Sequence, residues 1–306
     1  MIKSSIRSIF LSVWMTLSLT PLQAWWDAGH KTVAEIAYAD LTPVAKKAVD
    51  QIVEEFHKSH PDYETFADLS TWPDHLQEQE KTFLYSAPHF ITLPYDPEGI
   101  LSQAVKAGMQ TQSKQSGSIA YIEQAKAILA NNKASIFSKC WALSYLSHVV
   151  ADLHQPMHCC TRYSKELPKG DRGGNFHPII PMKNSKASNL HLLWDSGVGF
   201  LPVLSGDTAL DKKKLEIFAQ RVKEDLPKEK LTASASMDPN EWALESHKIA
   251  VEHAHKLKPN RAPSPMYIEN SKTIVEERIA LAGYRLSNML NVVFSSKEPV
   301  VLNGDK

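Results

Sequence analysis

Apolar residues recur with the period of an amphipathic α-helix along most of this chain. In residues 30–57, for example, Val33, Ile36 and Ala37 are spaced so that they share one face of a helix. The segments between such runs lack the alternation of apolar and polar residues that is typical of half-buried strands. The helical period predicts one or two helices over 30–57 and further helices over 117–132, 136–153, 211–225, 239–257 and 267–293.

The pattern is interrupted by loops rather than by domain boundaries. The segment 159–189 is polar and contains Gly170, Gly173 and Gly174, so we expect a long loop there. Pro227 ends the helical run that precedes it. No internal repeat, low-complexity tract or change of composition divides the chain. A single all-α domain with long loops is therefore the simplest prediction.

The first residues have the pattern of a secretory signal peptide. Two basic residues precede an apolar stretch from Ile9 to Leu19, and a small residue, Ala24, follows. The stretch is short for a lasting membrane span, which makes a retained anchor helix the less favoured alternative. We expect a signal peptide at 1–24, a folded domain at 25–306 and no membrane anchor after processing. The expected location is the periplasm or the outside of the cell.

Composition excludes some classes of protein and raises one possibility. Of the 306 residues, 43% are hydrophobic and 22% are charged, which is ordinary for a globular chain and argues against disorder. The 34 basic residues balance 34 acidic ones, so nucleic acid would have to be bound at a local site and not by a basic field. The count of 13 histidines is high, and histidine is the commonest metal ligand. No feature indicates an obligate protein partner.

The three cysteines leave their pairing open. Cys140, Cys159 and Cys160 can form at most one disulfide within the chain, with one thiol left over. Buried free thiols are an equally good prediction.

Two His-x-x-x-Asp pairs are the strongest chemical signal. His148 and Asp152 are four residues apart in a predicted helix, so an imidazole and a carboxylate share one helix face. A second pair, His191 and Asp195, has the same spacing in an apolar context, and His158 follows the first pair closely. Each pair could also be a helix-surface ion pair. Two such pairs together favour a metal site.

Further candidate ligands lie nearer the N-terminus. Asp74 follows a Trp-Pro dipeptide, and His89 lies in an apolar stretch. His30 is five residues after Trp25, whose free α-amino group and carbonyl oxygen could chelate a metal once the signal peptide is removed. Imidazole and carboxylate ligands without thiolate suit zinc in a catalytic site.

This set of motifs resembles the S1/P1 nuclease family of zinc-dependent, single-strand-specific nucleases, whose fold is also that of the zinc phospholipases C. The order and spacing of the motifs, rather than any one of them, make the resemblance specific. The motifs are Trp25–His30, Trp72–Asp74, His89–Ile91, His148 with Asp152, Gln155–His158, Gly170–Asn175, Asn189–His191 with Trp194–Asp195, and Ala282–Leu286.

The resemblance implies three zinc ions in each chain and a nuclease-like catalytic domain over 25–306. Asp152 would bridge two of the ions, because a carboxylate has two oxygens to offer. The implied ligands are Asp74, His89, His148 and Asp152 for one ion, Trp25, His30 and Asp152 for a second, and His158, His191 and Asp195 for the third.

The resemblance also implies an activity. Zinc lowers the pKa of bound water toward about 7, and Asp74 would orient the attacking oxygen. Single-stranded RNA or DNA would be cut to 5′-nucleotides. An associated 3′-nucleotidase activity on 3′-nucleotides is expected. Phe90 occupies the position on which a base stacks, although it could equally be a core residue.

The chain departs from the family pattern in informative places. Gln77 stands three residues after Asp74, where fungal members carry a cation, and Thr92 stands three residues after His89, where an aspartate often contacts the base. These changes leave the rate and base preference open, together with RNA versus DNA. The cysteine pattern of the fungal and plant enzymes is absent, which favours a bacterial-type member.

Two other functions remain open from the sequence. One is a zinc-dependent phospholipase C, and the other is an exported protein in which zinc serves stability alone. Asp171 and Asn175 either form a turn or orient ligands. The remaining histidines are expected to be surface, loop or helix residues without a metal role, and they are His57, His60, His75, His154, His177, His247, His253 and His255.

Overall fold

The computed structural model describes residues 25–80, 87–115 and 117–295. The predicted signal peptide at 1–24 lies outside the described residues. The helices of more than one turn are α1 (Asp27–Ala39), α2 (Pro43–Ser59), α4 (Trp72–Glu80), α6 (Gln103–Gln115), α7 (Ser118–Ala130), α8 (Ile136–Leu153), α9 (Leu190–Asp195), α10 (Thr208–Asp225), α11 (Pro239–Glu252) and α12 (Pro265–Val293).

Short elements connect these helices. The four-residue helix α3 (Phe66–Leu69) precedes α4, and the strands β1 (Pro94–Tyr95) and β2 (Thr161–Arg162) pair in parallel. The 3₁₀ turns are η1 (Ala87–His89), η2 (Pro156–Cys159), η3 (Gly197–Gly199), η4 (Lys228–Lys230), η5 (Thr232–Ala235) and η6 (Ala254–Lys256). The described chain is therefore mainly helical, and the all-α prediction is confirmed.

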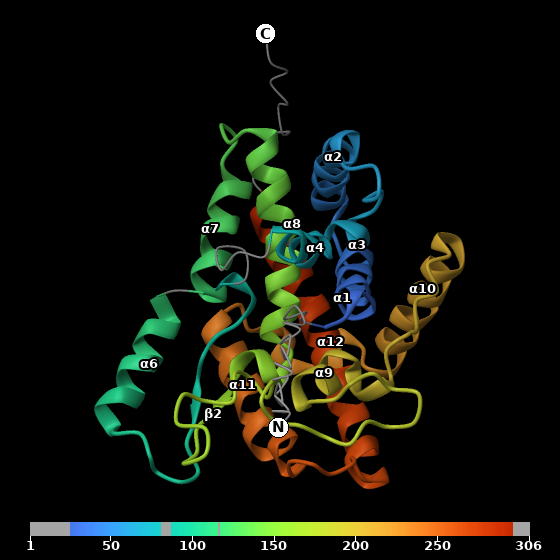
Figure 1. The fold of residues 1–306 in the computed structure, drawn as a ribbon. Helices are drawn as coiled ribbons and strands as arrows, with labels where there is room; N and C mark the ends of the chain where they lie inside the picture. Colours follow the sequence, from blue (N-terminus) through green and yellow to red (C-terminus); the bar gives the residue numbers. More distant parts are fainter. Residues whose placement is uncertain (1–24, 81–86, 116, 296–306) are drawn as a thin grey trace, which may run out of the picture.

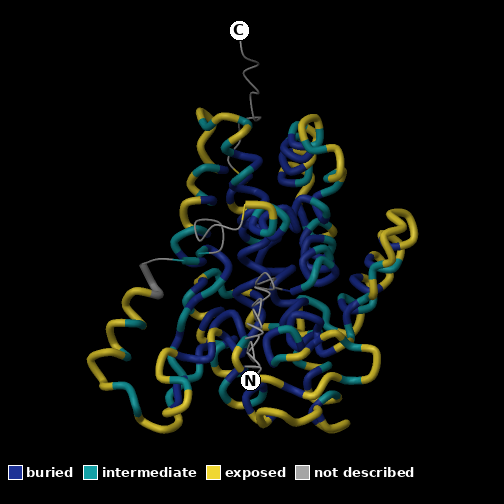
Figure 2. Tube along the Cα trace, in the orientation of Figure 1, coloured by how far each residue is buried: buried dark blue, intermediate teal, exposed yellow. Residues whose placement is uncertain are grey.

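Helix α8 runs through the middle of the molecule, with α7, α1 and α12 around it (Figures 1 and 2). Nearly all of its side chains are buried from Lys139 onward, on every face of the helix. The helix begins where the Ser135 hydroxyl accepts a hydrogen bond from the Ser138 N–H, and it ends just before Pro156. A helix that is buried all round holds its side chains in fixed positions, which suits a site built upon it.

Helices α1 and α12 cross closely because Gly283 has no side chain. A Cβ atom at this position would lie 2.5 Å from Cγ2 of Ile36, well inside van der Waals contact. The glycine therefore lets the backbone of α12 approach α1. This contact fixes α1, which carries His30.

Two arginines of α12 are fully buried beside α11. Arg278 and Arg285 both donate hydrogen bonds to the Glu245 carboxylate, at 2.7 Å. Arg285 also donates to Nε2 of His154, at 2.8 Å. This bond and a contact of Nδ1 with the Val150 carbonyl occupy both ring nitrogens of His154. His154 is thus part of the packing around α8.

Most predicted helices are present, with ends shifted by a few residues. The prediction for 30–57 becomes α1 and α2, and the segment 159–189 is a loop apart from the end of η2 and the strand β2. The helical period does not predict α3, α4 or α6. All three cysteines are free and buried, so the prediction of buried thiols holds in the structure. No helix among the described residues combines the length and apolarity that a membrane span requires.

Candidate metal centre

Four side chains form a first ligand group on the buried surface of α8. Nε2 of His148 lies 2.9 Å from Nδ1 of His89. Asp74 Oδ1 is 3.4 Å from each of these nitrogens. Asp152 Oδ2 is 3.2 Å from Nδ1 of His89 and 3.3 Å from Nε2 of His148. Ligand atoms around a tetrahedral zinc ion are separated by about 3.4 Å, given bond lengths near 2.1 Å. The geometry brings these four residues together at the spacing of a ligand set, and their role as ligands stays a prediction.

Neighbouring backbone carbonyls orient the imidazoles. Nδ1 of His148 donates to the Ser70 carbonyl at 2.7 Å, which points Nε2 at the carboxylates. Ser70 lies between α3 and α4, so the same turn supports His148 and begins the helix that carries Asp74. The His89 carbonyl similarly accepts a hydrogen bond from Nδ1 of His158 at 2.7 Å. Such contacts fix the tautomer and direction of a metal-binding histidine.

His30 adds a second group that shares Asp152 with the first. Its ring stacks on His148, with ring centroids 3.8 Å apart. Nε2 of His30 lies 3.4 Å from Asp152 Oδ1 and 3.9 Å from Asp74 Oδ2. Asp152 thus offers Oδ2 to the first group and Oδ1 to His30. A bridging carboxylate requires this arrangement.

Trp25 lies against α8 at the residue before Asp152. Its buried indole donates a hydrogen bond to the Ala151 carbonyl at 3.0 Å. Gly29 allows this packing, because a Cβ atom there would lie 2.5 Å from Cβ of Trp25. These contacts bring Trp25 to the site. Its role as a ligand through the backbone amine stays a prediction.

The third group combines η2 with α9. Nε2 of His158 is 3.7 Å from Asp195 Oδ1, and Nε2 of His191 is 3.4 Å from Asp195 Oδ2. Nδ1 of His191 donates to the Gly173 carbonyl at 2.7 Å, so the glycine-rich loop orients this ring. His191 and Asp195 lie together on one helix face, as their spacing predicts, and His158 joins them.

The three groups share one unusual property, which is that several of their buried polar atoms have no hydrogen-bond partner. Buried donors and acceptors are normally satisfied, so a cluster of exceptions calls for a ligand. Imidazole and carboxylate donors match zinc. The atoms are both ring nitrogens of His30, Asp74 Oδ1, His89 Nε2, both carboxylate oxygens of Asp152, His158 Nε2, His191 Nε2 and Asp195 Oδ2.

The charges in this cluster perturb one another strongly. Burial opposes ionisation of Asp152, but His148 outweighs burial and holds the pKa of Asp152 well below its usual range. Burial likewise opposes protonation of His158, yet Asp195 and Asp152 raise the pKa of His158 to about 9. For His30, burial and the nearby His148 ring lower the pKa to about 3. The centre therefore favours ionised carboxylates, which bind cations.

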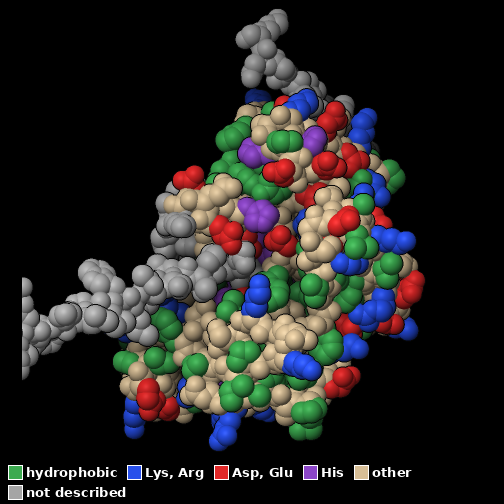
Figure 3. Space-filling view, turned by 45° about the vertical axis from the view of Figure 1, so that its right-hand side comes forward, with side chains coloured by type: hydrophobic (Ala, Val, Ile, Leu, Met, Phe, Trp, Pro, Cys, Tyr) green, Lys and Arg blue, Asp and Glu red, His purple; other side chains and the backbone are tan. Residues whose placement is uncertain are grey.

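A cavity opens beside the first and third groups. Phe90 is half-buried in its wall, and two cationic side chains, Lys169 and Arg172, lie in the same wall. Figure 3 shows exposed histidine and acidic side chains together near the middle of one face, whereas the candidate ligand side chains are buried. Three candidate metal ligands and a partly exposed aromatic ring thus line one cavity. Its lining residues are His89, Phe90, Ile91, Thr92, Met157, His158, Cys160, Thr161, Tyr163, Lys169, Arg172, Gly173 and His191.

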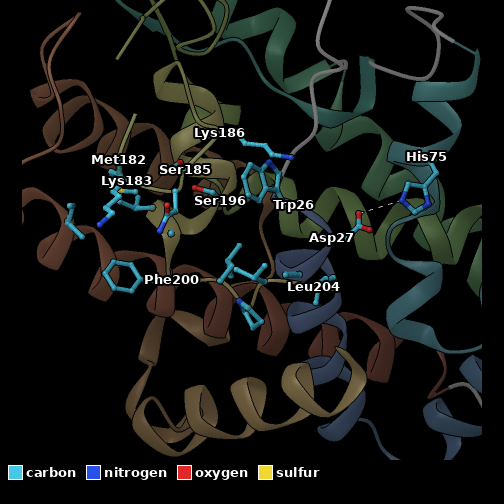
Figure 4. Close-up of a pocket in the computed structure, with 18 residues that line it drawn as sticks. Trp26, Asp27, His75, Met182, Lys183, Ser185, Lys186, Ser196, Phe200 and Leu204 are labelled. Atoms are coloured by element: carbon cyan, nitrogen blue, oxygen red, sulfur yellow. Dashed lines mark ion pairs between the residues drawn. The ribbon is translucent and has the colours of Figure 1, made fainter. Parts of the chain in front are cut away.

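A second hollow begins at residues adjacent to the ligands. Trp26 lies in it between Lys186 and the ion pair of Asp27 with His75, whose atoms are 3.5 Å apart (Figure 4). Trp26 and His75 directly follow Trp25 and Asp74 in the chain. This hollow and the Phe90 cavity share no lining residue.

Gln77 is buried on α4, and its Oε1 atom has no hydrogen-bond partner. A buried, neutral side chain therefore stands where fungal members of the family carry a cation.

The structure brings two of the remaining histidines together. His177 and His255 are buried and lie with Asp171 as a further group of possible ligands. The sequence alone predicts surface, loop or helix residues without a metal role at both positions. Only the tertiary packing of η6 near the glycine-rich loop makes them neighbours.

Comparisons with known proteins identify the family of this chain. The model of the S1/P1 nuclease family matches residues 25–295. Endonuclease 1 of Arabidopsis thaliana is 24% identical over 97% of this chain and 96% of its own length. Endonuclease 4 of the same plant is 25% identical over 96% of this chain and 97% of its own length. Nuclease S1 of Aspergillus oryzae is 24% identical over 92% of this chain and 96% of its own length. The chain belongs to the S1/P1 nuclease family.

Proposed function

We propose that this protein is an exported zinc-dependent nuclease that cuts single-stranded RNA and DNA to 5′-nucleotides and also acts on 3′-nucleotides. Its membership of the nuclease family supports action on phosphodiester bonds. The observation that carries the proposal is the convergence of three buried ligand groups, two of which contribute residues to the Phe90 cavity.

Three zinc ions fit the unpartnered atoms of the centre. Asp74, His89, His148 and Asp152 would hold the first ion, Trp25, His30 and Asp152 the second, and His158, His191 and Asp195 the third. When bound, zinc supplies Lewis acidity, which makes water acidic near neutral pH and neutralises charge on phosphoryl oxygens.

Asp74 is the residue that we assign to orient the attacking water. Burial raises the pKa of its carboxyl, but His148 and His89 lower it by more, so the carboxylate stays ionised at neutral pH. An ionised carboxylate accepts a hydrogen bond and can align the water with the phosphorus atom. The position of Asp74 at the start of α4, inside the first group, holds it beside the reacting atoms.

The Phe90 cavity supports a preference for single strands. An unpaired base can stack on the exposed part of the Phe90 ring, whereas a base within a duplex cannot reach it. Arg172 and Lys169 in the same cavity wall offer positive charge to the phosphates.

Export is supported by the sequence pattern of residues 1–24. Removal of that segment would create the amine of Trp25, a residue whose indole packs against α8. Binding of the second zinc ion would then require removal of the signal peptide.

The first test is the release of 5′-nucleotides from single-stranded RNA by protein that begins at Trp25, with and without a chelator. We expect release that the chelator abolishes and zinc restores. The variant Asp74→Asn should lose activity by about 10²-fold or more, and the exposed Asp225→Asn on α10 should keep it. Release from folded wild-type protein that is unaffected by complete metal removal would contradict the proposal.

A parallel assay addresses the two other functions. The family match favours nucleic acid over phospholipid as the substrate. Hydrolysis of phosphatidylcholine without hydrolysis of nucleic acid would reverse this assignment. Full zinc loading without turnover of either substrate would instead indicate a stabilising role for the metal.

A further inference from the structure

We propose that Asp171, His177 and His255 form a fourth metal site, suited to zinc, which ties the glycine-rich loop to η6. This site is separate from the three groups of the candidate centre and shares no ligand with them. Its proposed role is structural, because it supports the loop that orients the third group.

The three side chains meet in the geometry of a ligand set. One ligand atom of each lies within 4.8 Å of the other two. Nε2 of His255 is 3.8 Å from Asp171 Oδ2. This distance is too long for a hydrogen bond, yet it resembles the 3.7 Å between His158 and Asp195 in the third group. A direct hydrogen bond therefore does not account for the arrangement.

Unpartnered atoms supply the second, independent observation. Asp171 is 1% exposed, His177 4% and His255 8%. Asp171 Oδ1 accepts a hydrogen bond from the Arg162 N–H at 2.9 Å, but Oδ2 has no partner. Both ring nitrogens of His255 and Nε2 of His177 also lack partners. The three residues thus carry four buried polar atoms without a hydrogen-bond partner, and one atom of each residue belongs to the group.

The chemistry of the donors favours a divalent cation. His255 and His177 each supply a buried imidazole, which binds zinc through a neutral ring nitrogen. Asp171 contributes one negative charge when it binds a metal. Two imidazoles and a carboxylate are a common zinc set, with a fourth position left for water.

The position of the site explains what a metal there would do. The Gly173 carbonyl, two residues after Asp171, accepts the hydrogen bond from Nδ1 of His191. The His177 carbonyl accepts a hydrogen bond from the N–H of Leu190, at the start of α9, at 2.9 Å. A metal that fixes Asp171 and His177 would therefore fix the loop and the helix that orient His191.

The decisive experiment is anomalous diffraction at the zinc edge from crystals of the wild-type protein grown with excess zinc. We expect a peak between Asp171, His177 and His255 in addition to peaks at the candidate centre. Peaks at the centre without one at this position would overturn the fourth site. Density of a water molecule there without anomalous signal would overturn it too. Absence of peaks at the centre would count against the proposed function instead, so the two failures are distinguishable.

Variants give a second readout in solution. His255→Asn and His177→Asn should each lower the metal content by one ion per chain and lower the melting temperature in zinc. His253→Asn is the matched control, since this residue lies two positions from His255 but bonds to Ser271. Unchanged metal content in folded His255→Asn and His177→Asn would overturn the proposal. If neither variant folds, the diffraction experiment alone decides.

Discussion

The side-chain amide of Gln155 donates a hydrogen bond to Oδ1 of Asp195, a carboxylate of the third ligand group. Its own oxygen accepts the Met157 N–H, so the amide is fixed at both ends. We predict that Gln155→Ala lowers the zinc affinity of the third group by about 10–100-fold, because it frees the carboxylate to rotate. Competition with a chelator of known affinity measures the zinc affinity of each variant. Gln220→Ala, which removes an exposed amide on α10, is the control, and equal affinities for the two variants would refute the role of Gln155.

The N-terminus offers a second test, directed at the ligand role of Trp25. Residues added before Trp25 convert its amine into an amide, which is a poor metal ligand. We predict that such a protein binds one zinc ion fewer than protein beginning at Trp25 and loses most of its nuclease activity. The same residues added at the C-terminus should change neither quantity. Full activity with the N-terminal extension would rule out coordination by the amine.

Glu245 should control acid stability through the buried arginines Arg278 and Arg285. Burial raises the pKa of Glu245, but the arginines lower it by more, so the folded-state pKa lies below the usual value of 4.5. The stabilisation is thus present above pH 4.5 and lost as the pH falls through the folded-state pKa. At pH 7, Glu245→Gln should lower the free energy of unfolding by about 3 kcal/mol, the lower end for a broken buried pair, because 33% of this side chain is exposed.

Urea denaturation between pH 3 and pH 7 checks this prediction. The difference between wild type and Glu245→Gln should shrink as the pH falls below about 4.5. Glu276→Gln, which removes a partner of Arg221 near the surface, is the control and should lower the stability by less than about 1 kcal/mol. A difference that stays constant with pH would mean that Glu245 acts by packing alone.

The close crossing of α1 and α12 predicts opposite effects at two helical glycines. Gly283→Ala places a methyl group against Ile36 and should lower the free energy of unfolding by about 1–3 kcal/mol. Gly108 lies on the exposed surface of α6, where nothing is within 4 Å of an added Cβ. Gly108→Ala should therefore raise the stability by up to about 1 kcal/mol through helix propensity. Chemical denaturation of both variants and of the wild type measures these free energies of unfolding. An unchanged value for Gly283→Ala would show that α1 and α12 can move apart.

Sequence alone could place the ligands that lie on one helix. His148 and Asp152 share a face of α8 because of their spacing, and His191 and Asp195 share a face of α9 for the same reason. The helical period also predicts α8 itself. These are local properties, so no tertiary contact is needed to derive them.

Other features depend on packing between distant segments and could not be derived in this way. Asp171 and His255 are far apart in the chain, and no local pattern links a loop aspartate to a histidine of η6. Helix α6 is polar along much of its length and offers no apolar stripe to detect. The assignment of His89 to the first group rests on family resemblance, because a lone histidine in an apolar stretch is ambiguous.

Because α8 is buried on every side, it tolerates a change of residue far better than a change of length. Inserting one residue between His148 and Asp152 would rotate everything beyond it by about 100° about the helix axis. The carboxylate would then leave both ligand groups at once, and the apolar faces on α7 and α12 would lose their register. Along this helix, an insertion or deletion would therefore disrupt the packing and both ligand groups together, whereas a conservative substitution would change one contact surface.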